Sequence, residues 1–327
     1  MATVQHGNTK FQTFLVTMIK PAISIQGLTK TYSQGLFKDK VLAVDDLSMT
    51  IPEGSVVGLI GSNGAGKTTT IYCILGTLIP DAGQISIYGY PPQSIEARKR
   101  IGFQSEIFNT YNFLKPEKAL AFYGKLAGIE SENLAGRIDE KLSRLGLSGA
   151  KNQKVKSFSK GMNQRLGIAQ ALLHDPDLLL LDEPFTGLDP QGRREIIEII
   201  QEEKAKGKTI FFSSHILSDI ERVCDKVVMM RKGQVVLSGD IDQVTSITDN
   251  WCISVKGWEK EKERMLAGIE YEIVDFDGKT DLIIQQAEKE KALQILLDSG
   301  IEIVGLHPKM QSLEELYLEL DNKEEVS

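Results

Sequence analysis

The sequence has few cysteines, no long apolar run and no excess of positive charge, and each of these absences excludes a class of protein. Its three cysteines, Cys73, Cys224 and Cys252, are too few and too far apart for a disulfide framework or a zinc site, and they are typical of reduced thiols in a cytosolic protein. No window approaches the roughly 18 to 20 consecutive apolar residues that cross a bilayer, so we expect the chain not to span a membrane by itself. The formal net charge of −7 argues against nucleic-acid binding driven by overall positive charge.

The composition is that of a folded, globular protein. Hydrophobic residues make up 41% and charged residues 25% of the 327 residues, which excludes disordered, collagen-like and coiled-coil chains. A chain of this length accommodates about two domains. The stretch from Phe11 to Met18 is apolar, but it is short and lacks a small-residue cleavage site. We therefore predict that residues 1–21 form an N-terminal extension rather than a targeting segment.

Three apolar runs predict strands that are buried on both faces of a sheet. They lie at residues 56–60, 178–183 and 209–214, and helical segments alternate with them. This alternation indicates a mostly parallel α/β sheet. The block from about residue 108 to residue 156 has helical periodicity, so we expect a helical insertion there.

The pattern changes near residue 240. A strand over residues 251–258, a charged helical segment, a hairpin that turns at Asp277-Gly278, a helix, a strand and a final helix follow one another. Ser312 is the predicted N-cap of the final helix, in which apolar residues recur at helical spacing. These elements predict a small α+β accessory domain over residues 240–327, which we expect to help hold two subunits together.

The strongest chemical signal is the segment Gly61–Thr69, "GSNGAGKTT". It fits the pattern G-x-x-x-x-G-K-[ST] and stands between a predicted strand and a predicted helix, which is the context in which this pattern binds phosphate. The glycines let successive backbone N–H groups point at one anion, and the helix N-terminus adds partial positive charge. We expect Lys67 to reach the β and γ phosphates of a nucleotide, Thr68 to ligate Mg²⁺, and Thr69 to contact the α-phosphate side.

An acidic pair follows the second apolar run, in "LLLLDEP". Asp182 is predicted at the tip of a buried strand, where it can hold the water shell of Mg²⁺, and Glu183 is next to it, where it can accept a proton from the attacking water. An acidic pair at a strand end is by itself more often a solvated turn. The buried leucines and the upstream phosphate loop favour the catalytic interpretation.

The remaining motifs occur in an order that resembles the ATP-binding cassette (ABC) ATPases. Residues 158–165, "FSKGMNQR", resemble the signature motif, whose usual form is LSGGQ. Gln104 in "IGFQSE" matches the Q-loop, "TGLD" at residues 186–189 matches the D-loop, and His215 matches the switch histidine. Tyr32 matches the aromatic residue that stacks on adenine.

The resemblance covers roughly residues 22 to 238 and implies both a fold and a set of site residues. The implied fold is an α/β P-loop NTPase core: a mixed, mostly parallel sheet with an N-terminal antiparallel β subdomain and a helical subdomain at about residues 106–165, within a nucleotide-binding domain over residues 22–239. The implied cofactors are ATP and Mg²⁺. The implied catalytic residues are Glu183, His215 and Gln104, and the implied magnesium ligands are Thr68, Gln104 and Asp182. The implied nucleotide-binding residues are Tyr32, Gly61, Ser62, Asn63, Gly64, Ala65, Gly66, Lys67, Thr68, Thr69, Ser159, Gly161 and Asp189.

In this family the signature segment of one subunit closes over the γ-phosphate of the ATP held by its partner. The resemblance therefore implies a homodimer, or a heterodimer with a related ATPase subunit. Ser159 and the backbone N–H of Gly161 would form this second anion site. Lys160 replaces the usual first glycine and Met162 the usual glutamine, so the edge of the site departs from the common form.

The function that the resemblance favours is that of the ATPase subunit of a membrane transporter, peripheral on the cytoplasmic face. Separate permease chains would dock their cytoplasmic coupling helices beside Gln104 and would determine the substrate. The amino-acid sequences of the motifs and the small C-terminal domain are most similar to those of the subfamily that serves type-2 exporters. Alternatives are an importer subunit and a soluble cassette ATPase that acts on nucleic acid or ribosomes. The single phosphate loop and the lack of sustained heptads disfavour the latter, so we expect no nucleic-acid partner. A phosphate-loop kinase or GTPase would leave the signature segment unexplained.

Overall fold

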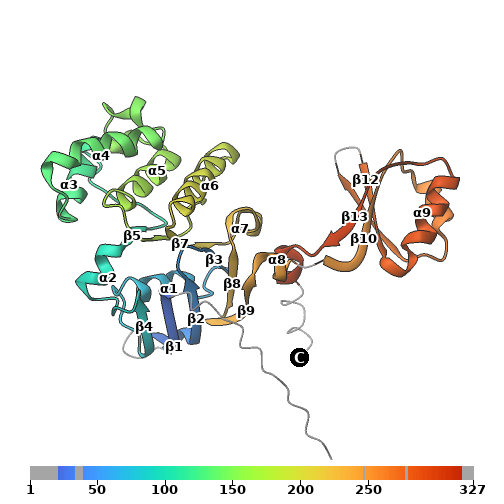
Figure 1. Ribbon diagram of the computed structural model, residues 1–327, viewed down its shortest axis with the longest axis horizontal. Coiled ribbons are helices and arrows are strands. Elements are labelled where there is room, and N and C mark those ends of the chain that lie inside the picture. The colour runs from blue at the N-terminus through green and yellow to red at the C-terminus, as the bar shows by residue number, and fades with distance from the viewer. Residues whose placement is uncertain (1–20, 34–39, 246, 277–278, 319–327) are drawn as a thin grey trace, which may run out of the picture.

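The centre of the protein is a six-stranded sheet in the order β5-β6-β7-β3-β8-β9 (Figure 1). The computed structural model describes residues 21–33, 40–245, 247–276 and 279–318. The first five strands of the order are parallel, and β9 is antiparallel to β8. The strands are β3 (Val56–Ile60), β5 (Ile101–Gln104), β6 (Leu178–Leu181), β7 (Thr209–Ser214), β8 (Lys226–Arg231) and β9 (Gln234–Asp240). The predicted mixed, mostly parallel sheet is confirmed.

Two hydrophobic cores cover the two faces of this sheet. Alternate residues of one strand enter different cores: Leu179 and Leu181 of β6 pack into one, and Leu178 and Leu180 into the other. The helices beside the sheet are α1 (Lys67–Ile74), α6 (Pro190–Ala205) and α7 (Leu217–Val223). Burial on both faces explains why these strands are continuous apolar runs rather than alternating ones.

An antiparallel sheet in the order β2-β1-β4 flanks the central one. Its strands are β1 (Pro21–Ser33), β2 (Lys40–Pro52) and β4 (Ala82–Ile87). Ile23, Ile51 and Ile87 are fully buried and belong to the core that also holds Leu178 and Leu180. The predicted N-terminal antiparallel β subdomain is therefore present. The predicted extension lies outside the described residues except for Pro21.

The helical insertion forms one end of the molecule, where α3, α4 and α5 lie together (Figure 1). Its elements are α3 (Pro116–Leu126), α4 (Ser131–Arg144), η1 (Ser148–Ala150), η2 (Val155–Ser157) and α5 (Lys160–Ala171), whereas α2 (Ile95–Arg100) comes before the central strand β5 and lies outside the insertion. Helix α5 begins in the signature segment and continues to Ala171, because Leu166 and Ile168 are buried in the core. This helix thereby joins the insertion to the central sheet.

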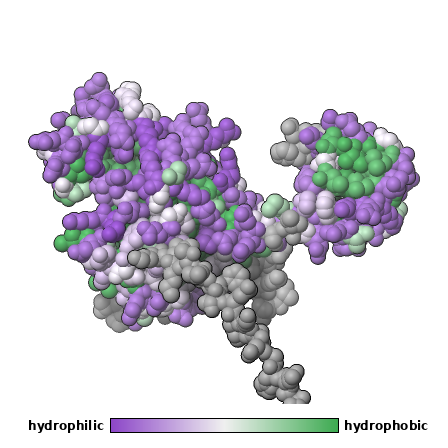
Figure 2. Space-filling model, viewed as in Figure 1, coloured by the Kyte–Doolittle hydropathy of each residue, from purple (hydrophilic) through white to green (hydrophobic). Residues whose placement is uncertain are grey.

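A four-stranded antiparallel sheet in the order β11-β12-β10-β13 forms the accessory unit after residue 240. Its elements, with the helix that leads into it, are α8 (Ile241–Val244), β10 (Ile247–Lys256), η3 (Lys260–Leu266), β11 (Tyr271–Phe276), β12 (Lys279–Gln285), η4 (Gln286–Glu288), α9 (Lys289–Asp298) and β13 (Glu302–Met310). Leu282 and Ile284 of β12 pack with Leu296 of α9 in a core of their own. Figure 2 shows apolar residues gathered on the face of this unit that is turned to the viewer. The charged segment predicted as a helix is the 3-10 helix η3. The predicted hairpin turn at residues 277–278 lies outside the described residues.

The final helical segment, residues 313–318, packs its apolar side chains into the core of the cassette, and Glu315 forms an ion pair at 3.0 Å with Lys309 of the accessory sheet. Ser312 accepts a hydrogen bond from the N–H of Glu315 at 3.1 Å, and the Glu315 carboxylate accepts one from the N–H of Ser312 at 3.1 Å, which confirms Ser312 as the N-cap. Leu313 is fully buried, and its N–H donates to the Glu221 carboxylate of α7 at 2.6 Å. The accessory unit therefore contacts the cassette at both of its ends, through Ile241 and through Leu313.

Among the residues that the structure describes, no helix combines the length and the apolar character needed to cross a bilayer.

Candidate active site

The phosphate loop, residues 61–66, connects the carboxyl end of the buried strand β3 to the start of α1, as the sequence predicted. Gly66 has a φ of +103°, and a Cβ atom there would overlap the backbone oxygen of Ala43. A Cβ atom on Gly61 would overlap the oxygen of Met230 in the same way. Only glycine fits at these two positions, so the loop lies tightly against β2 and β8.

Lys67 is nearly buried, at 6% exposure, and its ammonium group lies across the loop. It donates to the oxygen of Gly61 at 2.6 Å and lies 3.4 Å from the Glu183 carboxylate. The cation therefore joins the phosphate loop to the acidic end of β6. A phosphate group entering here would meet a positioned, poorly hydrated positive charge.

A cavity of about 490 Å³ opens in front of the loop. The predicted site residues that line it are Ser62, Asn63, Gly64, Ala65, Gly66, Lys67, Thr68, Thr69, Glu183 and His215. The predicted residues that do not line it are Tyr32, Gly61, Gln104, Ser159, Gly161, Asp182 and Asp189. The structure thus brings the loop, Glu183 and the switch histidine to one cavity, and leaves the signature segment elsewhere.

Asp182 is buried directly behind Thr68. The Thr68 hydroxyl donates to Asp182 Oδ1 at 3.4 Å, and the Ser213 hydroxyl of β7 donates to the same oxygen at 2.7 Å. Burial raises the pKa of Asp182; these two hydrogen bonds oppose that shift, and the carboxylates of Glu183 and Glu106 add to it. A cation bound beside Asp182 would favour its ionised form.

Glu183 lies between Lys67 and His215. Its Oε2 atom is 2.7 Å from Nδ1 of His215, and the Thr186 hydroxyl donates to it at 3.3 Å. Its backbone has a φ of +50°, which is rare for a residue with a side chain, and its N–H donates to Ser213 Oγ at 2.9 Å. A carboxylate fixed in this way beside a phosphate site can accept a proton from water.

Gln104 does not reach the cavity. Its side chain is fully buried, its Nε2 donates to the oxygen of Ser105 at 2.6 Å, and its Oε1 has no hydrogen-bond partner. The exposed carboxylate of Glu106, two residues further on, lines the cavity instead. Sequence analysis did not single out Glu106. One feature could have identified Glu106. Strand β5 ends at Gln104, and side chains beyond the end of a strand are free to turn toward the phosphate loop.

An apolar surface lies beside the phosphate loop at the antiparallel sheet. Tyr32 pairs across the strands with Val41, and its hydroxyl is 3.4 Å from the Thr69 hydroxyl. Val41 and Leu42 are 43% and 47% exposed and line the cavity, although sequence analysis did not select them. Directly opposite residues present their side chains on the same face, so Tyr32 and Val41 form a platform that could hold a flat ring.

The signature segment packs against the D-loop outside the cavity, although Thr186, the first residue of the D-loop, lines the cavity. Ser159 Oγ accepts the N–H of Met162 at 3.2 Å, and Asp189 Oδ1 accepts the N–H of Gly192 at 2.8 Å, so both residues are N-caps. The side chain of Lys160 lies over Gly187 in the D-loop. The N-terminus of α5 therefore lies on a surface that is separate from the nucleotide cavity of the same chain.

Mg²⁺ fits beside the phosphate loop by the chemistry of the donors. Thr68 and Asp182 supply a hydroxyl and a carboxylate oxygen side by side, and Mg²⁺ typically takes one or two protein oxygens with water and substrate phosphates completing its shell. Within the described ranges, no cluster of three or more His, Cys, Asp or Glu side chains forms a metal site by itself. The arrangement suits a metal that arrives with a nucleotide.

Ser213 is a supporting residue that sequence analysis overlooked. It is fully buried and connects the Asp182 carboxylate to the backbone of Glu183. We expect Ser213→Ala to lower the free energy of unfolding by about 1–3 kcal/mol, because it leaves the buried N–H of Glu183 without a partner and removes the hydrogen bond at 2.7 Å to Asp182. Urea denaturation measures this, with the exposed Ser157→Ala as a control expected to shift stability by less than about 0.5 kcal/mol.

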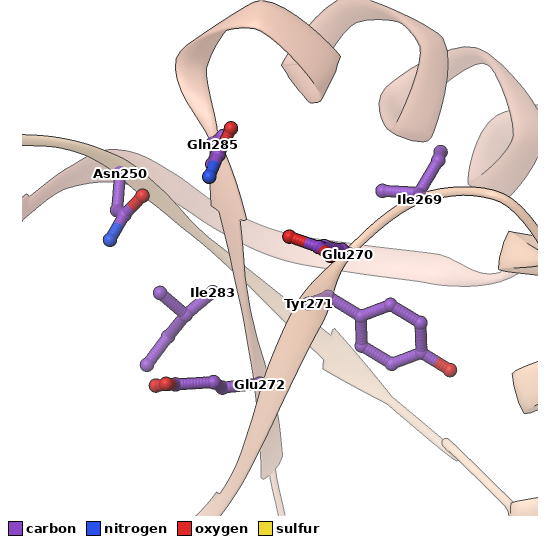
Figure 3. Close-up of a pocket in the computed structure, with 7 residues that line it drawn as sticks. All are labelled: Asn250, Ile269, Glu270, Tyr271, Glu272, Ile283 and Gln285. Carbon is purple, nitrogen blue, oxygen red and sulfur yellow. The ribbon is translucent and has the colours of Figure 1, made fainter.

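A second cavity, of about 460 Å³, lies on the accessory sheet (Figure 3). Asn250, Ile283 and Gln285 lie on one side of it, and Glu270 and Glu272 extend from β11 and the segment before it. Its lining consists of two carboxylates, two amides, the Tyr271 phenol and two isoleucines.

Comparison with known proteins gives consistent results. The family model described as ABC transporter matches residues 44–186. An uncharacterized ABC transporter ATP-binding protein of Nostoc is 36% identical over 319 residues, which are 96% of this chain and 94% of the relative. The ABC transporter ATP-binding protein NatA of Bacillus subtilis is 40% identical over 224 residues, which are 66% of this chain and 91% of NatA. A solved structure of an ATP-binding subunit of an ABC transporter superposes with a TM-score of 0.61 at 33% identity, covering 68% of this chain and 91% of that chain.

Proposed function

The chain belongs to the ABC transporter family as an ATP-binding subunit and is an ATPase, and from this premise we propose that it couples ATP hydrolysis to transport through a separate membrane permease. The observation that carries the proposal is that Lys67, Glu183 and His215 meet in one cavity at the phosphate loop. The cassette would extend over residues 22–239 and the accessory domain over residues 240–327.

The phosphate loop would hold the triphosphate, with Tyr32 against the adenine ring. Lys67 would leave the oxygen of Gly61 and bind the β and γ phosphates. Thr68 and Asp182 would hold Mg²⁺; when bound, this ion neutralises negative charge on the phosphates during transfer. The adjacency of Thr68 and Asp182 supports this assignment.

We assign proton acceptance from the attacking water to Glu183. Its carboxylate is fixed by His215 at 2.7 Å and by Thr186 at 3.3 Å, so it is oriented before the substrate arrives. In this role His215 donates through Nδ1 and holds the carboxylate in place. The water so activated would attack the γ-phosphorus in line.

Ser159, Gly161 and Asp189 would act on a nucleotide bound by a second subunit, either a copy of this chain or a relative. The support is their position: they lie outside this chain's own cavity, at a helix N-terminus suited to an anion. Closure of two subunits on two ATP molecules, and opening after hydrolysis, would drive transport.

A groove of about 470 Å³ adjoins the nucleotide cavity and is a suitable dock for a permease segment. It is lined by apolar and aromatic side chains that include Ile107, Phe108 and Tyr123. Among the residues that line the groove, the exposed charged side chain is that of Glu106, so we expect the docking segment to be basic. Docking here would hold the chain on the cytoplasmic face of the membrane.

The transporter that we propose is an exporter. This rests on the similarity of the motifs and of the C-terminal domain to the type-2 exporter subfamily. The match to the Nostoc relative covers 96% of this chain and therefore includes both the cassette and the accessory domain. This supports the view that the two domains occur together as one architecture. An importer subunit remains the alternative, and a transport assay in membrane vesicles of known orientation separates the two.

The permease dock can be tested at Ile107, which is 67% exposed and lines the groove. We expect Ile107→Lys to reduce recovery of a membrane-spanning partner with the tagged chain by at least about tenfold, because it places a positive charge in an apolar contact and opposite a basic segment. Ile79→Lys, at a residue that is 71% exposed and not in the groove, is the matched control. Equal recovery with both variants would remove the groove from the docking role.

A further inference from the structure

We propose that a basic groove beside the permease dock binds anionic lipid headgroups of the cytoplasmic leaflet, so that the chain contacts the membrane surface directly as well as its permease. The groove, of about 750 Å³, lies between α2 and the segment that connects α3 to α4. Figure 1 shows these elements at the end of the molecule that is remote from the accessory unit. In the described part of the chain, the groove shares no lining residue with the nucleotide cavity or with the permease dock. The inference rests on the proposed function, which places the chain on the cytoplasmic face.

The charge of the basic groove is opposite in sign to that of the whole chain, which is −7. Arg98 and Lys99 of α2 and Arg137 of α4 line the groove, and the carboxylate of Glu130 is the acidic group in its lining. Arg98 and Lys99 are exposed, and neither forms an ion pair with any residue that the structure describes. An anion that enters the groove therefore meets cations that are not already neutralised.

Two half-buried side chains, Arg137 and His174, belong to the same lining. Arg137 Nη1 donates to the backbone oxygen of Leu173 at 3.3 Å, and His174 Nε2 lies 3.0 Å from the backbone oxygen of Ile101. Burial lowers the pKa of His174, and the hydrogen bond to Ile101 opposes that shift. Because its pKa lies below the ordinary value, the imidazole is largely neutral at pH 7, and the positive charge of the groove comes from the arginines and the lysine.

Two exposed apolar side chains accompany these cations. Ile95 of α2 is 66% exposed and Leu126 of α3 is 69% exposed, and both line the groove. Apolar side chains beside Arg and Lys are typical of surfaces that lie in the headgroup region of a bilayer, where cations contact phosphate and apolar groups reach the acyl boundary. A small soluble anion would use the cations and leave Ile95 and Leu126 in water. The combination therefore favours a lipid surface as the occupant.

The basic groove and the permease dock lie on the same side of the cassette. Strand β5 contributes Ile101 to the groove and Phe103 to the dock, and residues two apart on a strand point to the same face. Helix α3 contributes Leu126 to the groove and Tyr123 to the dock, and residues three apart on a helix are neighbours on its surface. A permease segment seated in the dock would therefore bring the basic groove toward the membrane in which that permease is embedded. The cytoplasmic leaflet has a negative surface potential, which attracts basic side chains.

The test is co-sedimentation of the full-length protein with vesicles that contain no permease. We expect the protein to partition at least about tenfold more strongly into vesicles of equal parts phosphatidylglycerol and phosphatidylcholine than into phosphatidylcholine alone, and less strongly as salt is raised. The double variant Arg98→Gln/Lys99→Gln should lower partitioning into the anionic vesicles at least about tenfold, because each basic residue near the surface contributes about fivefold. Lys154→Gln/Lys279→Gln removes two exposed lysines outside the groove and should stay within about threefold of the unmodified protein. Thermal unfolding establishes that both double variants are folded.

Equal partitioning of Arg98→Gln/Lys99→Gln and the unmodified protein into the anionic vesicles would overturn the inference. So would a protein that ignores the vesicles but binds a labelled amphipathic peptide of leucine and glutamate through Arg98 and Lys99, because the occupant would then be an acidic polypeptide. The permease experiment at Ile107 keeps the two proposals apart. If vesicle binding fails while Ile107→Lys still releases the permease, only the lipid contact is rejected; if the vesicles bind while Ile107→Lys retains the permease, only the dock is rejected.

Discussion

Replacing Glu183 by glutamine is expected to lower the turnover number for ATP at least about a hundredfold while leaving ATP binding intact. The amide keeps the shape of the side chain and can still contact His215, but it cannot accept a proton from water, and general-base catalysis typically contributes two to four orders of magnitude. Because hydrolysis no longer opens the assembly, we expect an ATP-bound dimer to accumulate. Phosphate release at saturating ATP and size-exclusion chromatography with ATP measure the two effects.

Glu198→Gln is the matched control for this experiment. Glu198 is an exposed carboxylate on α6, so the variant makes the same change of charge away from the cavity, and we expect turnover within about twofold of the unmodified protein. Unimpaired turnover in Glu183→Gln would remove Glu183 from the catalytic role. Slow turnover without an ATP-dependent dimer would keep Glu183 and reject the two-subunit arrangement.

Replacing Lys67 by alanine is expected to weaken nucleotide affinity by about two orders of magnitude. The variant removes the Lys67 ammonium group from the lining of the cavity. It also leaves the Glu183 carboxylate facing the phosphates without the ammonium group that lies 3.4 Å from it. Charge-assisted hydrogen bonds to phosphate are among the strongest in proteins, and a buried carboxylate without its cation adds repulsion. Fluorescence titration with a labelled ATP analogue in Mg²⁺ measures the affinity.

Lys125→Ala controls for the loss of one positive charge. Lys125 is exposed on α3 and does not line the cavity, so its removal should change affinity by less than about threefold. Thermal unfolding of both variants establishes that each is folded. Affinity retained by a folded Lys67→Ala protein would contradict the phosphate-loop assignment.

Much of the fold could be predicted from local sequence. The apolar run Leu178–Leu181 is a strand whose alternate leucines enter two different cores, and two-sided burial leaves no room for polar positions. The phosphate loop is equally local, because a strand, a glycine-rich turn and a helix are contiguous in the chain. Ser312 was predictable for the same reason, since an N-cap acts within three residues.

The site was harder to predict where side-chain direction matters. The motif match selected Gln104, but this residue ends the buried strand β5 and its side chain turns into the core. Glu106, beyond the strand, faces the cavity. A motif specifies residue types in order along the chain, and it does not specify on which side of a strand end each side chain emerges.

The sequence by itself determined the elements, the phosphate loop and the identity of the acidic pair, because each depends on neighbours a few residues apart. The tertiary structure alone decided which distant groups meet. In the folded protein Ser213 contacts both Asp182 and Glu183. The last helix contacts the cassette, where the N–H of Leu313 donates to Glu221 of α7. Such contacts arise because buried polar groups must find partners and apolar faces must be covered, and either requirement can be met by any compatible residue that the fold brings near.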